Sequence, residues 1–256
     1  ELVIGLGGDG TLNELANGLL ANGPNPQGPI LAAIPGGNAN VFARNMGFAN
    51  DPIAATNQLL AAVENESFKT IGVGKVSTAN LSRWFLFNSG MGLDAAVLAS
   101  METRRESGKL ASDASYAALA IRELFARTDR KKPALSLVCE TGEIYLDAHF
   151  ALIINLAPWA YLGKNALNPM PEASHETALD VYAPTTLSVP AIFRLVRRAM
   201  NGVSALGDKR VIALQDQKCI RLKADRPLWI QVDGDVIAQA SELSAEHIPN
   251  ALRVLA

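Results

Sequence analysis

The chain has 256 residues, of which 49% are hydrophobic and 19% charged, and its formal net charge is −2. A chain of this length can bury a sizeable core and is long enough for two modest domains. Its charge gives no electrostatic footprint for nucleic acid, so we predict no nucleic-acid partner. Cys139 and Cys219 are isolated from each other and from histidines, which argues against a zinc site and fits a reducing cytoplasm.

The longest apolar stretch lies near residues 150–162. It is interrupted by Asn155 and Pro158 and is too short to span a bilayer. We therefore predict no transmembrane segment.

The first fourteen residues combine an apolar strand, a glycine-rich turn and a helix start. They read Glu1-Leu-Val-Ile-Gly-Leu-Gly-Gly-Asp-Gly-Thr-Leu-Asn-Glu14. We expect a strand over residues 2–6 that is buried on both faces, and a helix over 11–21 that begins with a capping box of Thr11 and Glu14. Glycines let the backbone approach a ligand, and the positive end of a helix attracts anions. The segment predicts a phosphate-binding loop.

Two other glycine motifs do not fit this loop. Gly5, Gly7 and Gly10 match the Gly-x-Gly-x-x-Gly spacing of dinucleotide-binding folds, which also needs an acidic residue at the end of the next strand. The next predicted strand, residues 30–34, is followed instead by Pro35-Gly-Gly37. A Walker-type loop would place Gly-Lys-Ser or Gly-Lys-Thr after the glycines, and this loop has neither.

A second glycine loop, Pro35-Gly-Gly-Asn-Ala-Asn40, precedes another predicted helix, for which Asn38 or Asn40 can be the cap. Loops after parallel strands open at the same sheet edge, so the two loops are expected to form a two-sided cradle for an anion. Asp9 lies between glycines at a helix start, where its charge would repel phosphate unless a cation intervened. We therefore predict that Asp9 reaches magnesium on a bound polyphosphate.

The pattern of elements changes near Lys69. Residues 1–68 alternate strands, glycine loops and helices, whereas residues 69–256 contain short β-type runs with helical insertions near 92–127 and 189–201. We predict an α/β domain over 1–68 and a mainly antiparallel β domain over 69–256. Only two strand-and-loop units precede the change, and the chain opens inside a strand, so we expect the α/β domain to be truncated at its start.

The second helical insertion is amphipathic. Its predicted basic face carries Arg194, Arg197 and Arg198, and its predicted apolar face carries Ile192, Leu195, Val196 and Ala199. Such a helix suits docking on a membrane surface, although most helices of this kind bury the apolar face in the protein core.

Near the C-terminal end, two apolar runs flank Asp233-Gly-Asp235. Asp-Gly is a favoured two-residue hairpin turn. That turn does not require a second carboxylate, and Asp235 at a hairpin tip can accept a proton from a hydroxyl group that attacks a γ-phosphate. We predict that Asp235 is a catalytic base.

Four segments in order resemble the motifs of the diacylglycerol kinase catalytic-domain family, which includes bacterial lipid kinases and sphingosine kinases and is related to NAD kinases. They are Gly7-Gly-Asp-Gly-Thr-Leu-Asn-Glu14, Pro35-Gly-Gly-Asn-Ala-Asn40, Asn88-Ser-Gly-Met-Gly-Leu-Asp-Ala95 and Val232-Asp-Gly-Asp235. The resemblance covers most of the chain. It implies an N-terminal nucleotide-binding domain, a C-terminal β-sandwich-like domain, and a cleft between them in which ATP phosphorylates a lipid hydroxyl.

The same resemblance implies which residues hold the nucleotide. By position, these are Gly7, Gly8, Asp9, Gly10, Thr11 and Asn13 in the first loop and Gly37 and Asn38 in the second. Asn38 stands where the family commonly has a threonine that contacts ATP, and Asp235 stands where it has a glutamate that accepts the proton. Both replacements keep the polar or acidic character, but Asp235 is shorter than glutamate by one methylene, about 1.5 Å.

A further segment, Asn168-Pro-Met-Pro-Glu-Ala-Ser-His-Glu-Thr-Ala-Leu-Asp180, resembles a family loop that binds a structural magnesium in bacterial relatives. By position, the metal ligands implied are Ala173, Glu176 and Ala178. Glu176-Thr177 replaces the family's Asp-Gly, which keeps a carboxylate but restricts the loop. We expect His175 to be a solvated loop residue.

The sequence thus predicts an ATP- and Mg²⁺-dependent lipid kinase, cytoplasmic and peripheral at the membrane, that acts on diacylglycerol or a related lipid. Two alternatives stay open. One is an NAD kinase-like phosphotransferase, because NAD kinases share Gly-Gly-Asp-Gly-Thr. The other is a non-catalytic nucleotide- or lipid-binding regulator, motivated by the replacements at Asn38, Asp235 and Glu176-Thr177. The oligomeric state, including a homodimer, is also open.

Overall fold

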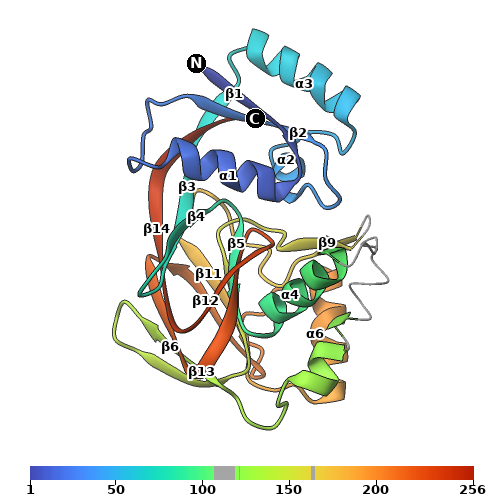
Figure 1. Ribbon diagram of the computed structural model, residues 1–256, viewed down its shortest axis with the longest axis vertical. Helices are drawn as coiled ribbons and strands as arrows, with labels where there is room; N and C mark the ends of the chain where they lie inside the picture. The colour runs from blue at the N-terminus through green and yellow to red at the C-terminus, as the bar shows by residue number, and fades with distance from the viewer. Residues whose placement is uncertain (107–118, 121, 163–164) are drawn as a thin grey trace.

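The computed structural model describes residues 1–106, 119–120, 122–162 and 165–256. A twelve-stranded sheet runs through an α/β half, at the top of Figure 1, and a larger β-rich half below it. The elements of the α/β half are β1 (Leu2–Gly7), α1 (Asp9–Leu19), β2 (Ile30–Pro35), α2 (Val41–Asn45) and α3 (Pro52–Glu64). The predicted fold class, an α/β part followed by a mainly antiparallel β part, is confirmed.

Strands β1 and β2 are parallel, with Leu2 opposite Ile30 and Gly7 opposite Pro35, so both glycine loops leave the same edge of the sheet. The prediction that the first strand is buried on both faces is wrong. Ile4 and Leu6 are 48% and 66% exposed, because α1 packs against one face of β1 while α3 lies against β2.

Helix α1 begins two residues earlier than predicted, and the predicted capping box is not formed. Gly8 is the N-cap residue and no side chain caps the helix. Glu14 turns away to form an ion pair with Arg83 instead. Without a Cβ at Gly8 and Gly10, the backbone can tighten directly from strand into helix.

The β-rich half contains most of the strands. Its elements are β3 (Phe68–Ser77), β4 (Ser82–Phe85), β5 (Asn88–Met91), α4 (Leu93–Glu106), the π-helical turn Glu123–Arg127, β6 (Leu135–Cys139), β7 (Ile144–Ala148), β8 (Ala151–Ile154), β9 (Ala160–Leu162), β10 (Asn165–Leu167), β11 (Leu179–Pro184), α6 (Val189–Met200), β12 (Val211–Gln217), β13 (Cys219–Val232) and β14 (Asp235–Leu255). All strand pairs within this half are antiparallel. Part of the helical insertion predicted near 92–127 lies outside the described residues.

The last two strands connect the halves. The predicted hairpin at Asp233-Gly234 is confirmed: both residues have positive φ, 47° and 89°, and they join β13 to β14. Strand β14 then runs the length of the molecule, and Val254 pairs in parallel with Leu31 of β2. Both chain ends therefore lie in the α/β half (Figure 1). The division between residues 68 and 69 stays a prediction, since β3 and β14 pair with each other along both halves.

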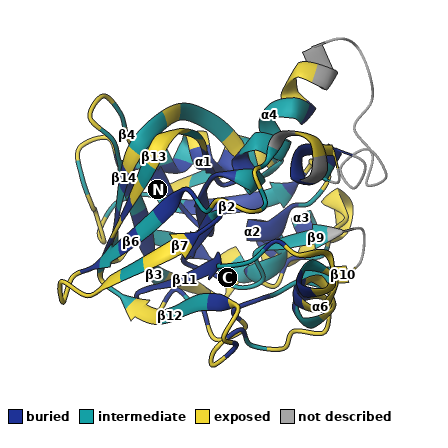
Figure 2. Cartoon of the chain, turned by 90° about the horizontal axis from the view of Figure 1, so that it is seen from below, coloured by how far each residue is buried: buried dark blue, intermediate teal, exposed yellow. Residues whose placement is uncertain are grey.

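Among the described residues, three clusters of buried side chains fill the molecule. One joins the α/β half to Trp84, Leu86 and Phe87 of the β-rich half, and two lie within the β-rich half. Figure 2 shows the buried residues along the central strands and the exposed ones on outer loops. Helix α6 buries Ala191, Leu195 and Ala199. The prediction that Val196 shares this face is wrong, because Val196 is 50% exposed. No described helix is long and apolar enough to cross a membrane.

Candidate functional site

The two glycine loops pack backbone against backbone. The Gly36 N–H donates to the Gly7 carbonyl over 2.8 Å. A Cβ added to Gly37 would lie 2.5 Å from the Gly8 Cα, so the loops can approach this closely only because both residues are glycines. The predicted two-sided cradle is present as a backbone arrangement at the carboxyl edge of β1 and β2.

Asp9 ties the first loop to the second. Its two carboxylate oxygens accept the backbone N–H groups of Val41 and Phe42, each over 3.0 Å, and so cap helix α2. The expected caps do not do this: the Asn40 side chain bonds instead to the backbone of Gly37, and the residue adopts a φ of 48°. The pKa of Asp9 is raised above its ordinary value. Burial is the largest cause and the charge of Asp235 adds to it, whereas the two N–H donors lower the pKa.

Asp235 lies at the first loop although it is near the other end of the chain. A Cβ on Gly10 would come within 2.6 Å of Asp235 Oδ2, so the carboxylate packs directly against the glycine backbone. Its charge also acts on Asp9. The structure therefore brings together Asp9, Gly10 and Asp235 at the N-terminus of α1.

Asp233, two residues before Asp235, holds the hairpin in place. Its carboxylate is 2% exposed and accepts backbone N–H groups from Leu86 at 2.7 Å and from Phe87 and Asn88 at 3.0 Å. It also accepts the Asn13 side-chain amide at 2.8 Å. Burial raises its pKa to about 7, against the effect of these four donors. Asp233 thus joins α1 of one half to the β4–β5 connection of the other.

Asn13, predicted to hold nucleotide phosphates, has its side chain placed inside the protein. The amide nitrogen donates to Asp233 and to the Trp84 carbonyl, and the oxygen accepts from Arg83. The residue is fully buried. Its observed contacts position α1 relative to the hairpin.

The remaining predicted loop residues face outward. Thr11, Gly37 and Asn38 are exposed, and the Thr11 hydroxyl lies over Gly7, where a Cβ would be 2.5 Å away. Exposed polar groups beside a helix N-terminus are available to an anion. The assignment of these residues to a nucleotide stays a prediction.

The segment predicted to bind a structural magnesium lies between β10 and β11 in the chain. Glu176 is exposed, and the carbonyl of Ala173 accepts the Ala157 N–H over 3.1 Å. The Ala178 N–H donates to Asp216 over 2.8 Å. Within the described ranges, no three His, Cys, Asp or Glu side chains gather as a metal site. A site built mainly from carbonyls stays a prediction.

His175 in the same segment is buried, so the expectation of a solvated loop residue is wrong. Its Nδ1 lies 3.2 Å from the Asn155 amide, and its ring meets Phe42 edge-on at 6.2 Å. Burial and the charge of Lys69 lower its pKa to about 3. The sequence neighbours of His175 are polar, so nothing local signals this burial.

Asp94, in the third motif, is a buried carboxyl group near the hairpin. Burial raises its pKa to about 7, and a hydrogen bond from Gln231 opposes that shift. Gln231 also donates to Asn88 and accepts from the Gly234 N–H, which places this group of polar residues directly behind the Asp233–Asp235 turn.

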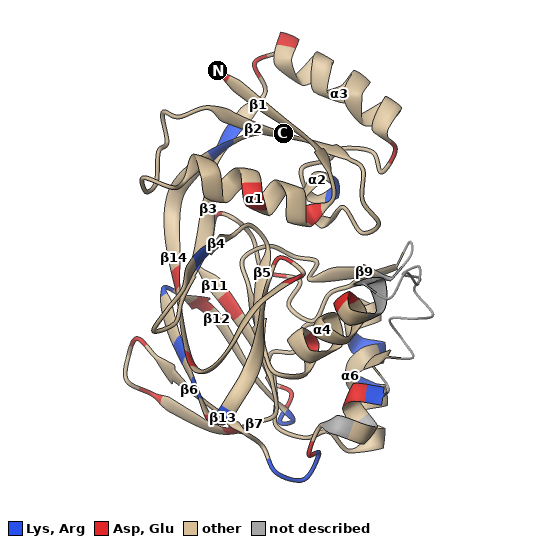
Figure 3. Ribbon diagram, viewed as in Figure 1, with Lys and Arg blue, Asp and Glu red and all other residues tan. Residues whose placement is uncertain are grey.

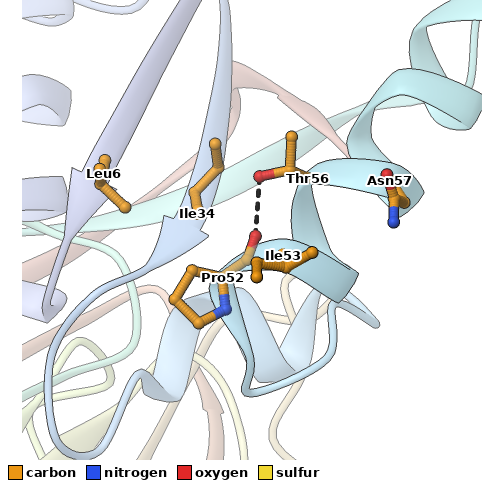
Figure 4. Close-up of a pocket in the computed structure, with 6 residues that line it drawn as sticks. All are labelled: Leu6, Ile34, Pro52, Ile53, Thr56 and Asn57. Atoms are coloured by element: carbon orange, nitrogen blue, oxygen red, sulfur yellow. Dashed lines mark hydrogen bonds between the residues drawn. The ribbon is translucent and has the colours of Figure 1, made fainter.

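A hollow of about 270 Å³ lies beside the loops on the outer side of β1 and β2. It is lined by Leu6, Ile34, Pro52, Ile53, Thr56 and Asn57 (Figure 4). The Thr56 hydroxyl donates a hydrogen bond to the Pro52 carbonyl. This hollow has no charged side chain, so it offers neither a counter-charge for phosphate nor a carboxylate for a cation, whereas Asp9 and Asp235 lie at the loop edge.

The fold is shared with two classes of kinase. A crystal structure of a diacylglycerol kinase from Bacillus anthracis aligns with 99% of this chain and 75% of that chain, with a TM-score of 0.68 and 19% identity. An NAD kinase from Archaeoglobus fulgidus, solved in complex with ATP, aligns with 100% of this chain and 77% of that chain, with a TM-score of 0.52 and 11% identity. At these identities the likeness establishes the fold.

Comparison of the sequence points to the first of these two classes, the diacylglycerol kinases. Residues 1–76 match the family model of the diacylglycerol kinase catalytic domain. The diacylglycerol kinase of Bacillus subtilis is 38% identical over 77 residues, which are 30% of this chain and 23% of that protein. The diacylglycerol kinase of Staphylococcus carnosus is 35% identical over 86 residues, 34% of this chain and 24% of that protein. The matched segment spans about a quarter of these relatives. The predicted resemblance to the diacylglycerol kinase catalytic-domain family is confirmed over residues 1–76, while its extension to the rest of the chain stays a prediction.

Proposed function

We propose that this chain is a lipid kinase that transfers the γ-phosphate of ATP to a hydroxyl group of diacylglycerol or a related lipid at a membrane surface. The observation that carries the proposal is the contact of the Asp235 carboxylate with the Gly10 backbone. It supplies a proton acceptor at the loop to which we assign the phosphates, and the site therefore combines phosphate binding with acid–base chemistry.

In this proposal residues 1–68 bind the nucleotide. The backbone of Gly7, Gly8, Gly10 and Gly37 lies against the phosphate oxygens, and the N-terminal end of α1 favours their negative charge. Thr11 and Asn38 contribute exposed polar side chains. Such a site works by positioning and charge neutralisation, as is general for phosphoryl transfer.

Asp9 is the residue we assign to magnesium. Each of its oxygens accepts one backbone N–H and retains a second lone pair. The repulsion between Asp9 and Asp235 is a feature that a cation would relieve, so the donor set fits a hard divalent ion. When bound with the nucleotide, magnesium neutralises charge that develops on the phosphate oxygens.

Asp235 is the residue we assign as general base. The acceptor hydroxyl gives its proton to the Asp235 carboxylate while its oxygen attacks the γ-phosphorus, and the bond to the ADP oxygen breaks. Asp233 holds the hairpin, and through Asn13 it fixes the distance between this base and the α1 N-terminus. Residues 69–256 would then hold the lipid acceptor.

The test is phosphate transfer by the full chain from γ-labelled ATP, with magnesium, to diacylglycerol in detergent micelles, with NAD as acceptor in a parallel reaction. Asp235→Asn is the matched variant, since it keeps the size of the side chain and removes the base. We expect label in the organic phase with the natural chain and at least a 100-fold lower rate with the variant.

Three results would contradict the proposal. Label on NAD alone would identify an NAD kinase-like phosphotransferase. ATP binding with no transfer to either acceptor would identify a regulator. Equal rates for the natural chain and Asp235→Asn would remove Asp235 from the chemistry.

A further inference from the structure

Helix α6 carries a continuous apolar stripe that faces away from the protein. Val189, Phe193, Val196 and Met200 are 49%, 78%, 50% and 46% exposed. Their spacing of four, three and four residues places them on one side of the helix. Val203 and Leu206, also exposed, extend the stripe beyond the helix end. Exposed apolar residues that gather in this way mark an interaction surface.

The side of α6 opposite the stripe is held against the protein, so the helix presents the stripe on a fixed support. Leu195 and two alanines are buried against the β-rich half. Asp208, which is almost fully buried, lies within 3.8 Å of Arg194 and Arg198 and within 3.4 Å of Arg210. These ion pairs fix the chain after the helix against the helix itself.

The surroundings of the stripe are basic. Residues 189–210 contain five Lys or Arg residues and one acidic residue, Asp208, in a chain whose net charge is −2. Three of the cations share Asp208, whereas Arg197 and Lys209 have no ion-pair partner among the described residues and are exposed. Figure 3 shows the Lys and Arg residues on and around α6. Apolar side chains bordered by unpaired cations complement a bilayer with anionic headgroups.

The stripe is also connected to the candidate site. The Asn168 N–H, next to β10, donates to the Ala199 carbonyl of α6 over 2.8 Å. At the same end of the β9–β10 pair, just before β9, the Trp159 carbonyl accepts the Asn88 amide over 3.0 Å, and Asn88 is one of the residues that hold Asp233. Helix α6 and β9 lie on the same side of the molecule (Figure 1).

We propose that α6 docks the protein on anionic lipid bilayers. The four apolar side chains of the stripe enter the interface between headgroups and acyl chains, and Arg197 and Lys209 contact the anionic headgroups. This inference rests on the proposed function in one respect: a lipid kinase has to reach an acceptor lipid in the bilayer. Docking itself requires neither ATP nor transfer.

The test is flotation of the full chain with vesicles of phosphatidylcholine alone or mixed with phosphatidylglycerol, without nucleotide. The variants are Phe193→Ser/Val196→Ser and Arg197→Gln. The matched control is Ile144→Ser/Leu146→Ser, which removes two apolar side chains of similar exposure, 61% and 62%, on β7. We expect binding that needs phosphatidylglycerol, a loss of at least tenfold for the double variant and about fivefold for Arg197→Gln, which corresponds to about 1 kcal/mol per cation near the surface.

Four outcomes would overturn the inference: no binding by the natural chain, equal binding to both vesicle types, the same loss in the β7 control, or a dimer in solution that the Phe193 variant dissociates. The last would make the stripe an interface between two copies. Transfer to diacylglycerol in detergent micelles, measured in parallel, separates this question from the proposed function. We expect the α6 variants to retain it, and a chain without kinase activity would still be expected to float.

Discussion

The two sides of the candidate site are constructed differently. The glycine loops form their side from backbone alone, since Gly8 and Gly37 approach within a distance that any Cβ would prevent. The β13–β14 hairpin forms its side from a side-chain network centred on the buried Asp233. Backbone can shape a surface for phosphate oxygens, but only side chains can accept a proton, so each side has the construction that its proposed role requires.

The sharpest test compares substitutions of two residues of the hairpin, Asp235 and Asp233. Asp235→Asn removes an exposed carboxylate from the loop edge. We expect a loss of transfer rate between about 100-fold and 10,000-fold, the usual contribution of a general base. Stability should change by about 1 kcal/mol or less, because the side chain is exposed. Initial rates and urea unfolding of the same preparations measure both effects.

Asp233→Ala should give the opposite pattern. It leaves three backbone N–H groups and the Asn13 amide without their acceptor in a buried position. We expect the free energy of unfolding to fall by about 3 kcal/mol or more, because unsatisfied buried donors each carry a desolvation cost. Asp235→Ala is the control in the same turn. Equal losses of stability for the two variants would show that Asp233 does not join the two halves.

On the glycine side, Gly37→Ala should separate the loops. The added methyl group would meet the Gly8 backbone at 2.5 Å, and backbone cannot move aside as a flexible side chain can. We expect ATP affinity to fall about tenfold, equivalent to 1.4 kcal/mol. Gly18→Ala in α1 is the matched control, because no atom lies within 4 Å of its added Cβ. That change should leave affinity unaltered and stabilise the helix by up to about 1 kcal/mol. Unchanged affinity for Gly37→Ala, measured by calorimetry, would remove this loop from the nucleotide site.

Local chemistry explains which parts of this site the sequence could predict. The strand-to-glycine-to-helix order and the Asp-Gly hairpin depend on neighbouring residues, and both are confirmed. The expected capping box failed because the helix begins at Asp9 with Gly8 as its N-cap, which puts Thr11 inside the helix, and Glu14 pairs with Arg83. The cap of α2 comes from Asp9, which is 32 positions away and invisible to a local pattern.

Long-range pairing explains what the sequence could not predict. The single strand β14 reaches from the hairpin to β2, although its residues include several charged and polar ones that obscure its alternation. The role of Asp233 depends on three consecutive N–H groups in the β4–β5 connection, which only the fold brings together. The exposure of Val196 likewise depends on which face of α6 packs against the protein, and helical periodicity alone does not determine that face.

The smallest effect we predict concerns a second contact between the halves, the buried His175 against Phe42 of α2. Its pKa is lowered to about 3 in the folded protein, whereas in the unfolded chain it is about 6.5. Between these two pH values, the unfolded state therefore binds a proton at His175 that the folded state does not bind. The stability that neutral His175 contributes is complete above pH 6.5 and is lost as the pH falls towards 3.

His175→Asn removes this proton-linked change and keeps a polar side chain next to Asn155. Between pH 6.5 and 5.5, the free energy of unfolding of the natural chain should fall by about 1 kcal/mol more than that of the variant. His149 and His247 are present in both proteins, so their titration cancels in the difference. Equal pH dependence would mean that water reaches His175 in the folded state. The contact between the two halves would then depend on the hydrogen bonds of Asp233 rather than on the packing of His175 against Phe42.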